Sequence, residues 1–177
     1  MSRTPSAATA VTAAKAPRKA PPEVAIDLET LPGHQIRRLH QIAVAIFLQE
    51  TGESGLTPVQ YGALQAVANR PAIDQRTLSG LIGLDTSTLA GVIDRLEARG
   101  LVERKASAED RRVKLVSPTT EGRAALAAAL PAMLRAQDRI LAPLSPADRL
   151  AFARMLDTLV TANNELSRAP SMGERRG

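Results

Sequence analysis

Residues 74–117, DQRTLSGLIGLDTSTLAGVIDRLEARGLVERKASAEDRRVKLVS, decide the fold of this chain. Leu78, Leu81 and Ile82 stand at i, i+3 and i+4, which predicts a short helix with one buried face. Gly83 is suited to end that helix, and Asp85 is suited to cap the next one. The second helix has an apolar face and a small, polar face: Leu89, Val92, Ile93 and Leu96 form the first, and Ser87, Thr88, Gly91 and Arg95 form the second.

A hairpin with a basic tip follows the two helices. Gly100 is suited to end the second helix, and the segments 101–105 (LVERK) and 111–117 (RRVKLVS) predict two strands joined by a loop. In the second strand apolar and basic residues alternate: Val113 and Leu115 with Arg112 and Lys114. Two helices joined by a tight turn and followed by such a hairpin form a winged helix-turn-helix. This arrangement places its second helix in the major groove of DNA.

Three short motifs lie in and after this stretch: DRLEARGLV at 94–102, DRRV at 110–113 and TTEG at 119–122. Together they resemble the MarR family of bacterial regulators. Asp110 and Arg112 match the family's D-x-R wing motif, whereas Pro118 stands where the family usually has leucine before T-x-x-G. The resemblance covers residues 31–166. It implies a mainly α fold, a winged helix-turn-helix with N- and C-terminal dimerisation helices.

Composition excludes several classes of function. The chain has 177 residues, which suits one domain, and it has no cysteine, so disulfides, thiolate metal sites and cysteine redox sensing are excluded. Only His34 and His40 could serve as imidazole ligands, so we expect no metal site and no cofactor. No phosphate loop or nucleophile–base motif is present, and we expect no enzymatic activity.

The positive charge is unevenly distributed. Residues 1–22 hold four of the cations and no acid, which accounts for most of the net charge of +5. In the rest of the chain the cations gather between residues 99 and 114, where six of them face three acids. A winged helix would contact phosphate there. The six cations are Arg99, Arg104, Lys105, Arg111, Arg112 and Lys114.

Three segments are expected. The sequence predicts a disordered basic tail over residues 1–28 and a frayed end over residues 168–177. Between them, residues 29–167 are expected to form the winged helix-turn-helix domain with its dimerisation helices. The tail is open to two interpretations, an arm that adds salt-sensitive attraction to DNA or a solvated leader without a role. It has no apolar core of the length that a signal peptide or a membrane span needs, so we expect a cytoplasmic, nucleoid-associated protein.

Long helices are predicted on both sides of the helix-turn-helix. Residues 31–50 are apolar around most of the helix, 57–60 (TPVQ) form a capping box with proline at the first helical position, and 120–141 form a helix interrupted by Pro131. Ser145 begins a last helix. The apolar residues of the first and last helices exceed what one small domain can bury, so we expect a homodimer. The first helix contributes Ile36, Leu39, Ile46 and Phe47, and the last contributes Phe152, Leu156, Leu159 and Val160.

Candidate DNA-binding residues come from the second helix and the hairpin: Thr86, Ser87, Thr88, Gly91, Arg95, Asp110, Arg111 and Arg112. Ser87 and Thr88 suit both helix capping and phosphate binding. Gly91 suits either close packing against another helix or close approach of the backbone to DNA. In the wing, we expect Asp110 to pair with a nearby arginine and to leave Arg112 free to enter the minor groove; Arg111 could exchange roles with Arg112.

Candidate ligand-binding residues gather on the first helix, with one on the next: His34, Arg37, Arg38, Gln41 and Tyr61. The cluster suits either a polar rim of the dimer interface or a site for a carboxylate or phosphate. The family resemblance implies an effector between the dimerisation helices and the DNA-binding lobe, and residues 31–47 look most similar to members that sense aromatic acids or their coenzyme A thioesters.

The expected function is that of a ligand-responsive DNA-binding regulator. We expect a repressor that a small aromatic acid or its thioester releases from a pseudo-palindromic operator on double-stranded DNA. Two alternatives are open, a helical interaction module with a winged-helix shape and a DNA-binding protein that needs no ligand.

Overall fold

The computed structural model describes residues 26–166. All of the predicted frayed end (168–177) and nearly all of the predicted basic tail (1–28) therefore lie outside the described residues. The described part is mainly helical, as predicted, with six α-helices, three short strands and three 3-10 turns. The helices are α1 (Pro32–Thr51), α2 (Pro58–Asn69), α3 (Gln75–Ile82), α4 (Thr86–Ala98), α5 (Thr120–Leu141) and α6 (Pro146–Ala162). The strands are β1 (Ile73–Asp74), β2 (Val102–Ala106) and β3 (Lys114–Pro118), and the turns are Leu28–Thr30, Gly52–Ser54 and Asn164–Leu166.

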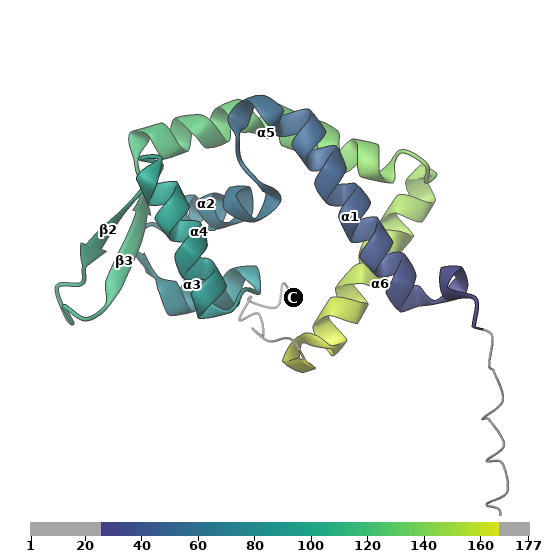
Figure 1. Cartoon of the computed structure of the whole chain (residues 1–177), viewed down its shortest axis with the longest axis horizontal. Coiled ribbons are helices and arrows are strands. Elements are labelled where there is room, and N and C mark those ends of the chain that lie inside the picture. Colours follow the sequence, from purple (N-terminus) through teal and green to yellow (C-terminus); the bar gives the residue numbers. More distant parts are fainter. Residues whose placement is uncertain (1–25, 167–177) are drawn as a thin grey trace, which may run out of the picture.

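The elements form an arch (Figure 1). Helices α2, α3 and α4 and the β2–β3 hairpin make a compact lobe at one end, and α6 and the first part of α1 lie at the other. The long helix α5 runs across the top and joins the two ends. The winged helix-turn-helix is thus attached to the remaining helices through α5 and through the connection between α1 and α2.

Side-chain caps define where the helices begin. A carboxylate or hydroxyl oxygen accepts a hydrogen bond from a backbone N–H in the first turn, which satisfies a donor that has no partner within the helix. The capping residues are Thr57 for α2, Asp74 for α3, Asp85 for α4, Thr119 for α5 and Ser145 for α6. Thr57 and Gln60 form the predicted capping box with Pro58 in the first turn. Gly83 ends α3 with a left-handed φ of 66°, as its position predicts.

The core lies within the winged-helix lobe. Its fully buried side chains come from α2, α3, α4 and the sheet: Leu64, Val67, Leu78, Leu89, Ile93, Leu96, Val102 and Val116, with Leu56 from the connection before α2. The helical spacing of Leu89, Ile93 and Leu96 therefore identified the buried face of α4 correctly. At the edge of this core Phe47 of α1 meets Tyr61 of α2 edge to face, with ring centroids 6.0 Å apart.

The sheet has three strands in the order β1-β3-β2, both pairs antiparallel. The sequence predicted the hairpin but not β1, which pairs Ile73 with Val116. It also began the second strand too early, because β3 starts at Lys114. Val113 lies in the turn, where its N–H donates to the carbonyl of Asp110 and its carbonyl accepts from Ser107. Within β3, Val116 is the residue that is buried in the core.

The start of α5 packs directly on the turn that follows α4. The Thr119 hydroxyl donates to the carbonyl of Gly100 at 2.6 Å, and the Thr119 N–H donates to the carbonyl of Leu101 at 3.2 Å. A Cβ placed on Gly122 would lie 1.9 Å from that Leu101 oxygen. Only glycine allows this approach, which gives a physical reason for glycine in the T-x-x-G motif.

Helices α1 and α6 leave much apolar surface exposed. No residue of α6 is buried, and of α1 only Phe47 and Thr51 are. The exposed apolar side chains of α1 are Ile36, Leu39, Ile42 and Leu48, and those of α6 are Leu150, Met155, Leu156, Leu159 and Val160. Within residues 26–166, no helix is long and apolar enough to cross a membrane.

Candidate DNA interface and ligand site

Helix α4 presents a polar face to the surface of the lobe. Its apolar residues point into the core, while Thr86, Ser87 and Thr88 in its first turn and Arg95 farther along are exposed. The Asp85 carboxylate caps the helix: it accepts hydrogen bonds from the Ser87 hydroxyl at 2.5 Å, the Thr88 N–H at 2.9 Å and the Thr88 hydroxyl at 2.7 Å. These bonds, that of the Ser87 hydroxyl above all, hold the pKa of Asp85 well below its usual range. The start of α4 therefore carries a fixed negative charge at neutral pH.

Gly91 lies on the same face of α4. A Cβ built on Gly91 would meet only the guanidinium of Arg95, at 3.7 Å and 4.0 Å. No other described element lies within 4 Å of that position, so packing against a neighbouring helix does not account for this glycine. The close approach of this backbone to DNA stays a prediction.

The turn of the hairpin is organised by Asp110, although not in the way that the sequence predicted. We expected the Asp110 carboxylate to pair with an arginine side chain; instead it accepts a hydrogen bond from the backbone N–H of Arg112 at 2.9 Å. A carboxylate two residues back can reach that N–H without any arginine, as in other Asx turns. Arg111 and Arg112 are both exposed at the tip. Among residues 26–166, neither side chain is engaged in an ion pair.

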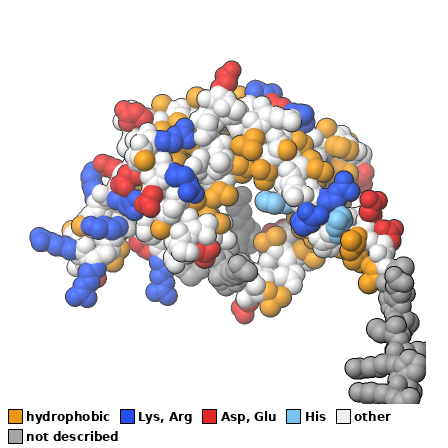
Figure 2. Space-filling view, in the orientation of Figure 1, with side chains coloured by type: hydrophobic (Ala, Val, Ile, Leu, Met, Phe, Trp, Pro, Cys, Tyr) orange, Lys and Arg blue, Asp and Glu red, His pale blue; other side chains and the backbone are white. Residues whose placement is uncertain are grey.

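Half of the cations counted in this region are engaged in ion pairs or hydrogen bonds within the lobe. Arg104 of β2 pairs with Asp94 and Glu97 of α4, and Lys105 pairs with Glu103 at 2.6 Å. Arg99, just after α4, donates to the backbone carbonyls of Ser54 and Gly55 at 2.9 Å and 2.8 Å. Within the described residues, the side chains of Arg111, Arg112 and Lys114 remain available to phosphate. Figure 2 shows such cations projecting from the hairpin end of the molecule.

Arg99 has a role that the sequence did not indicate. Its two carbonyl partners lie 45 and 44 residues earlier in the chain, between α1 and α2. A side chain bound to backbone carbonyls leaves no pattern in the sequence, because any residue supplies a carbonyl.

The ligand candidates on α1 lie together, whereas Tyr61 lies elsewhere. Arg37 donates to the Gln41 amide oxygen at 3.2 Å, and Arg38 stands 4.0 Å from Glu29. His34 is half-buried and the other three are exposed. Figure 2 shows histidines and cations grouped over α1. Tyr61 is only 7% exposed and contacts Phe47, which is about 20 Å along α1 from His34 at 1.5 Å per residue.

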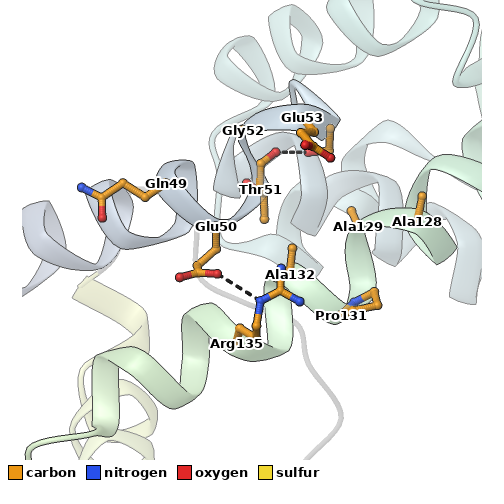
Figure 3. Close-up of a pocket in the computed structure, with 11 residues that line it drawn as sticks. Gln49, Glu50, Thr51, Gly52, Glu53, Ala128, Ala129, Pro131, Ala132 and Arg135 are labelled. Atoms are coloured by element: carbon orange, nitrogen blue, oxygen red, sulfur yellow. Dashed lines mark hydrogen bonds and ion pairs between the residues drawn. The ribbon is translucent and has the colours of Figure 1, made fainter.

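A cavity of 560 Å³ opens at the other end of α1, between the Gly52–Ser54 turn and α5 (Figure 3). Glu50 lies at its edge and accepts hydrogen bonds from Arg135 at 3.1 Å and Arg139 at 3.0 Å. The Arg135 bond, and then that of Arg139, lowers the pKa of the Glu50 carboxyl. The sequence gave no sign of this cluster, since its members are 85 and 89 residues apart.

Comparison with known proteins identifies the family. The MarR family profile matches residues 54–113, which include the helix-turn-helix, strand β2 and the turn of the hairpin but not strand β3. The transcriptional regulator HosA of Escherichia coli O127:H6 is 35% identical over 123 residues, covering 70% of this chain and 90% of HosA. The chain belongs to the MarR family. Solved structures of family members agree with the described fold.

Three of these structures were determined with a ligand or with DNA. The PcaV regulator of Streptomyces coelicolor, in complex with its natural ligand, is 34% identical, with a TM-score of 0.74 and coverage of 78% of this chain and 98% of PcaV. The transcriptional repressor CouR bound to a 23-mer DNA duplex is 30% identical, with a TM-score of 0.71 and coverage of 75% and 94%. CouR from Rhodococcus jostii RHA1 bound to p-coumaroyl-CoA is 28% identical, with a TM-score of 0.65 and coverage of 78% and 95%.

This MarR-family chain is a ligand-responsive DNA-binding transcriptional regulator. Its relatives are named as transcriptional regulators, a class that acts by binding rather than by catalysis. The winged-helix lobe carries the features that DNA binding requires: an exposed polar face on α4 and a cationic hairpin tip.

Proposed function

We propose that this protein is a homodimeric repressor that a small aromatic acid, or its coenzyme A thioester, releases from a pseudo-palindromic operator. The proposal rests on the different chemical character of the exposed surface at the two ends of the arch. The lobe presents α4 and a cationic hairpin at one end of the arch, and α1 and α6 present apolar side chains at the other. One end suits DNA and the other suits a second copy of the chain.

The apolar surface supports the dimer. Side chains such as Ile36, Leu159 and Val160 are more than half exposed in the single chain, and burial of a large apolar side chain is worth about 1.5–3 kcal/mol. Several such side chains on two helices make a patch that a monomer does not normally expose. A two-fold dimer would place two α4 helices at related positions, and an operator with two-fold symmetry follows from that geometry. Such a repressor would work on DNA in the cytoplasm.

The cluster on α1 supports an anionic effector. Arg37 and Arg38 are adjacent, and a guanidinium binds a carboxylate or phosphate through two parallel hydrogen bonds. Two similar structures provide the chemical class: 6-hydroxynicotinic acid regulates DNA binding by BpsR of Bordetella bronchiseptica, and CouR was solved with p-coumaroyl-CoA. A ligand bound here would lower DNA affinity if it binds more tightly to a dimer geometry in which the α4 helices are misplaced. The loss of DNA affinity cannot exceed the difference between its affinities for the two geometries.

A two-part experiment tests the proposal. Sedimentation of the full chain at micromolar concentration should show a dimer, and a duplex selected by the protein from a random-sequence pool should contain two related half-sites. Titration calorimetry with p-coumaric acid and p-coumaroyl-CoA then separates the free acid from the thioester.

Variants assign the effector site. Arg37→Ala/Arg38→Ala should weaken binding of the ligand that the parent protein prefers, and Arg37→Lys/Arg38→Lys should recover only part of it, because lysine keeps the charge and lacks the planar fork. Unchanged affinity in the alanine double variant would remove both arginines from the site. A folded monomer would contradict the dimer, and binding of neither ligand would contradict the proposed effector class.

A further inference from the structure

The outward face of α4 carries three residues in one row, spaced by four: Ser87, Gly91 and Arg95. Residues four apart lie above one another on a helix. The row is therefore a strip that runs along the helix at a shallow angle to its axis, opposite the side that Leu89 and Ile93 bury in the core.

Arg95 lies back along this strip. Both terminal nitrogens of its guanidinium, Nη1 and Nη2, are within 4.0 Å of the position that a Gly91 Cβ would occupy. Helical side chains point toward the N-terminus, so the guanidinium sits one turn before its own Cα, in the space that glycine leaves. Within residues 26–166 no ion pair or hydrogen bond engages the Arg95 side chain. The neighbouring acids Asp94 and Glu97 are both occupied by Arg104.

Ser87 at the start of the strip has a fixed hydrogen-bonding direction. A hydroxyl has one proton, and that of Ser87 is donated to the Asp85 carboxylate at 2.5 Å. What Ser87 offers to an incoming molecule is therefore the lone pairs of its oxygen. A phosphate has only acceptor oxygens and is also repelled by the Asp85 charge, so the Ser87 hydroxyl suits a donor instead.

We propose that this strip reads base edges: Arg95, seated over Gly91, donates both Nη groups to the O6 and N7 of a guanine, and Ser87 accepts from the exocyclic amino group of a cytosine or adenine. The major groove exposes both kinds of group. The inference rests on the proposed placement of α4 in that groove. Gly91 then has a defined role, because it makes room for the arginine to lie along the helix.

The experiment uses the full chain and duplexes that it selects from a random-sequence pool. Each guanine of one half-site is replaced in turn by 7-deazaguanine, which lacks only the N7 acceptor. At one position the parent protein should lose affinity by about tenfold, within the range that a bidentate contact provides. In Arg95→Met, which keeps most of the side-chain length but has no hydrogen-bond donor, the same replacement should have no further effect.

Gly91 offers a matched pair of variants. Gly91→Ala should keep the sensitivity to 7-deazaguanine, since its methyl would lie at ordinary contact distance, 3.7 Å, from the guanidinium. Gly91→Leu should abolish this sensitivity because the larger side chain occupies the space of the guanidinium. Leucine favours helix more than glycine does, so the loss would not reflect unfolding of α4.

Ser87 is tested in the same assay. Ser87→Ala should bind the selected duplex more weakly than the parent protein does. When the base that Ser87 contacts lacks its amino group, Ser87→Ala and the parent protein should bind the duplex equally.

The outcomes separate two failures. If the protein selects no duplex, the proposed operator binding fails and this inference fails with it. If it selects a duplex whose half-site contains no guanine, or if no 7-deazaguanine replacement changes the affinity of the parent protein, DNA binding stands and the reading by Arg95 is wrong. If Gly91→Leu keeps the full sensitivity, the seating of Arg95 on Gly91 is wrong.

Discussion

Replacement of Gly122 by alanine should destabilise the protein strongly, although alanine is the better helix former. The Cβ of the new side chain would be placed 1.9 Å from the carbonyl oxygen of Leu101 and 2.9 Å from its carbonyl carbon. Both are backbone atoms and cannot rotate away as a side chain would. The start of α5 must therefore move off the Gly100–Leu101 turn, and the two hydrogen bonds of Thr119 to that turn would be lost or stretched.

The magnitude follows from three contributions. Overpacking in a close contact costs about 1–3 kcal/mol. Each of the two Thr119 hydrogen bonds contributes about 1 kcal/mol. Alanine in place of glycine returns up to about 1 kcal/mol of helix propensity. The net loss is about 3 kcal/mol, a large part of the stability of a typical domain, which is about 5–15 kcal/mol.

Urea denaturation followed by circular dichroism measures this loss, at one fixed protein concentration because a dimer's stability depends on concentration. Gly62→Ala is the matched control, since Gly62 also lies in a helix and a Cβ there would have nothing within 4 Å. The control should be as stable as the parent or slightly more stable. If Gly122→Ala unfolded at the same urea concentration as Gly62→Ala, the close approach to Leu101 would be refuted.

Four further predictions concern the rest of the molecule. Glu50→Gln should reduce the free energy of unfolding at neutral pH. The difference in stability from the parent should shrink as the pH falls below 4.5, the ordinary pKa of a glutamate, and through the lowered pKa of Glu50; unfolding midpoints measured against pH test this. Thr57→Ala should lower the free energy of unfolding by about 1 kcal/mol, measured by thermal unfolding, because the capping box is lost. Thr57→Ser keeps the hydroxyl and should retain most of that stability. Val160→Glu should shift sedimentation toward the monomer, because it would place a charge in the proposed interface; a parent-like dimer would exclude this residue from it. Arg112→Ala should weaken binding to all duplexes similarly and lower the salt dependence by about one charge, and an unchanged salt slope would mean that Arg112 does not contact phosphate.

The features that the sequence predicted well depend on neighbouring residues. Asp85, Thr57 and Ser145 cap helices through backbone N–H groups three residues ahead, so the signal and its partner lie in one short window. The apolar spacing of α4 likewise reports its buried face, because the helical period fixes which residues point inward. The mainly helical fold and the winged hairpin could therefore be predicted.

The features that the sequence missed depend on distant segments. The pairing of β1 with β3 joins Ile73 to Val116, and two residues are too few to show an alternation. Val113 was expected in the strand because Val113 and Leu115 alternate with Arg112 and Lys114, but the Asp110 turn holds Val113 outside the ladder. Tyr61 was grouped with the ligand candidates, yet its ring packs against Phe47, away from His34. The contacts of the candidate site residues with DNA and effector remain predictions.

The bonds of Arg99 have a consequence for how this sequence can vary. Both acceptors are main-chain carbonyls, of Ser54 and Gly55, so the arginine does not need any particular side chain at position 54. Gly55 itself is constrained by its left-handed φ of 60° rather than by lack of room, since a Cβ there would lie 3.5 Å from the guanidinium. Every residue type at position 54 supplies the same carbonyl, so a comparison of sequences need not show any residue that varies together with Arg99.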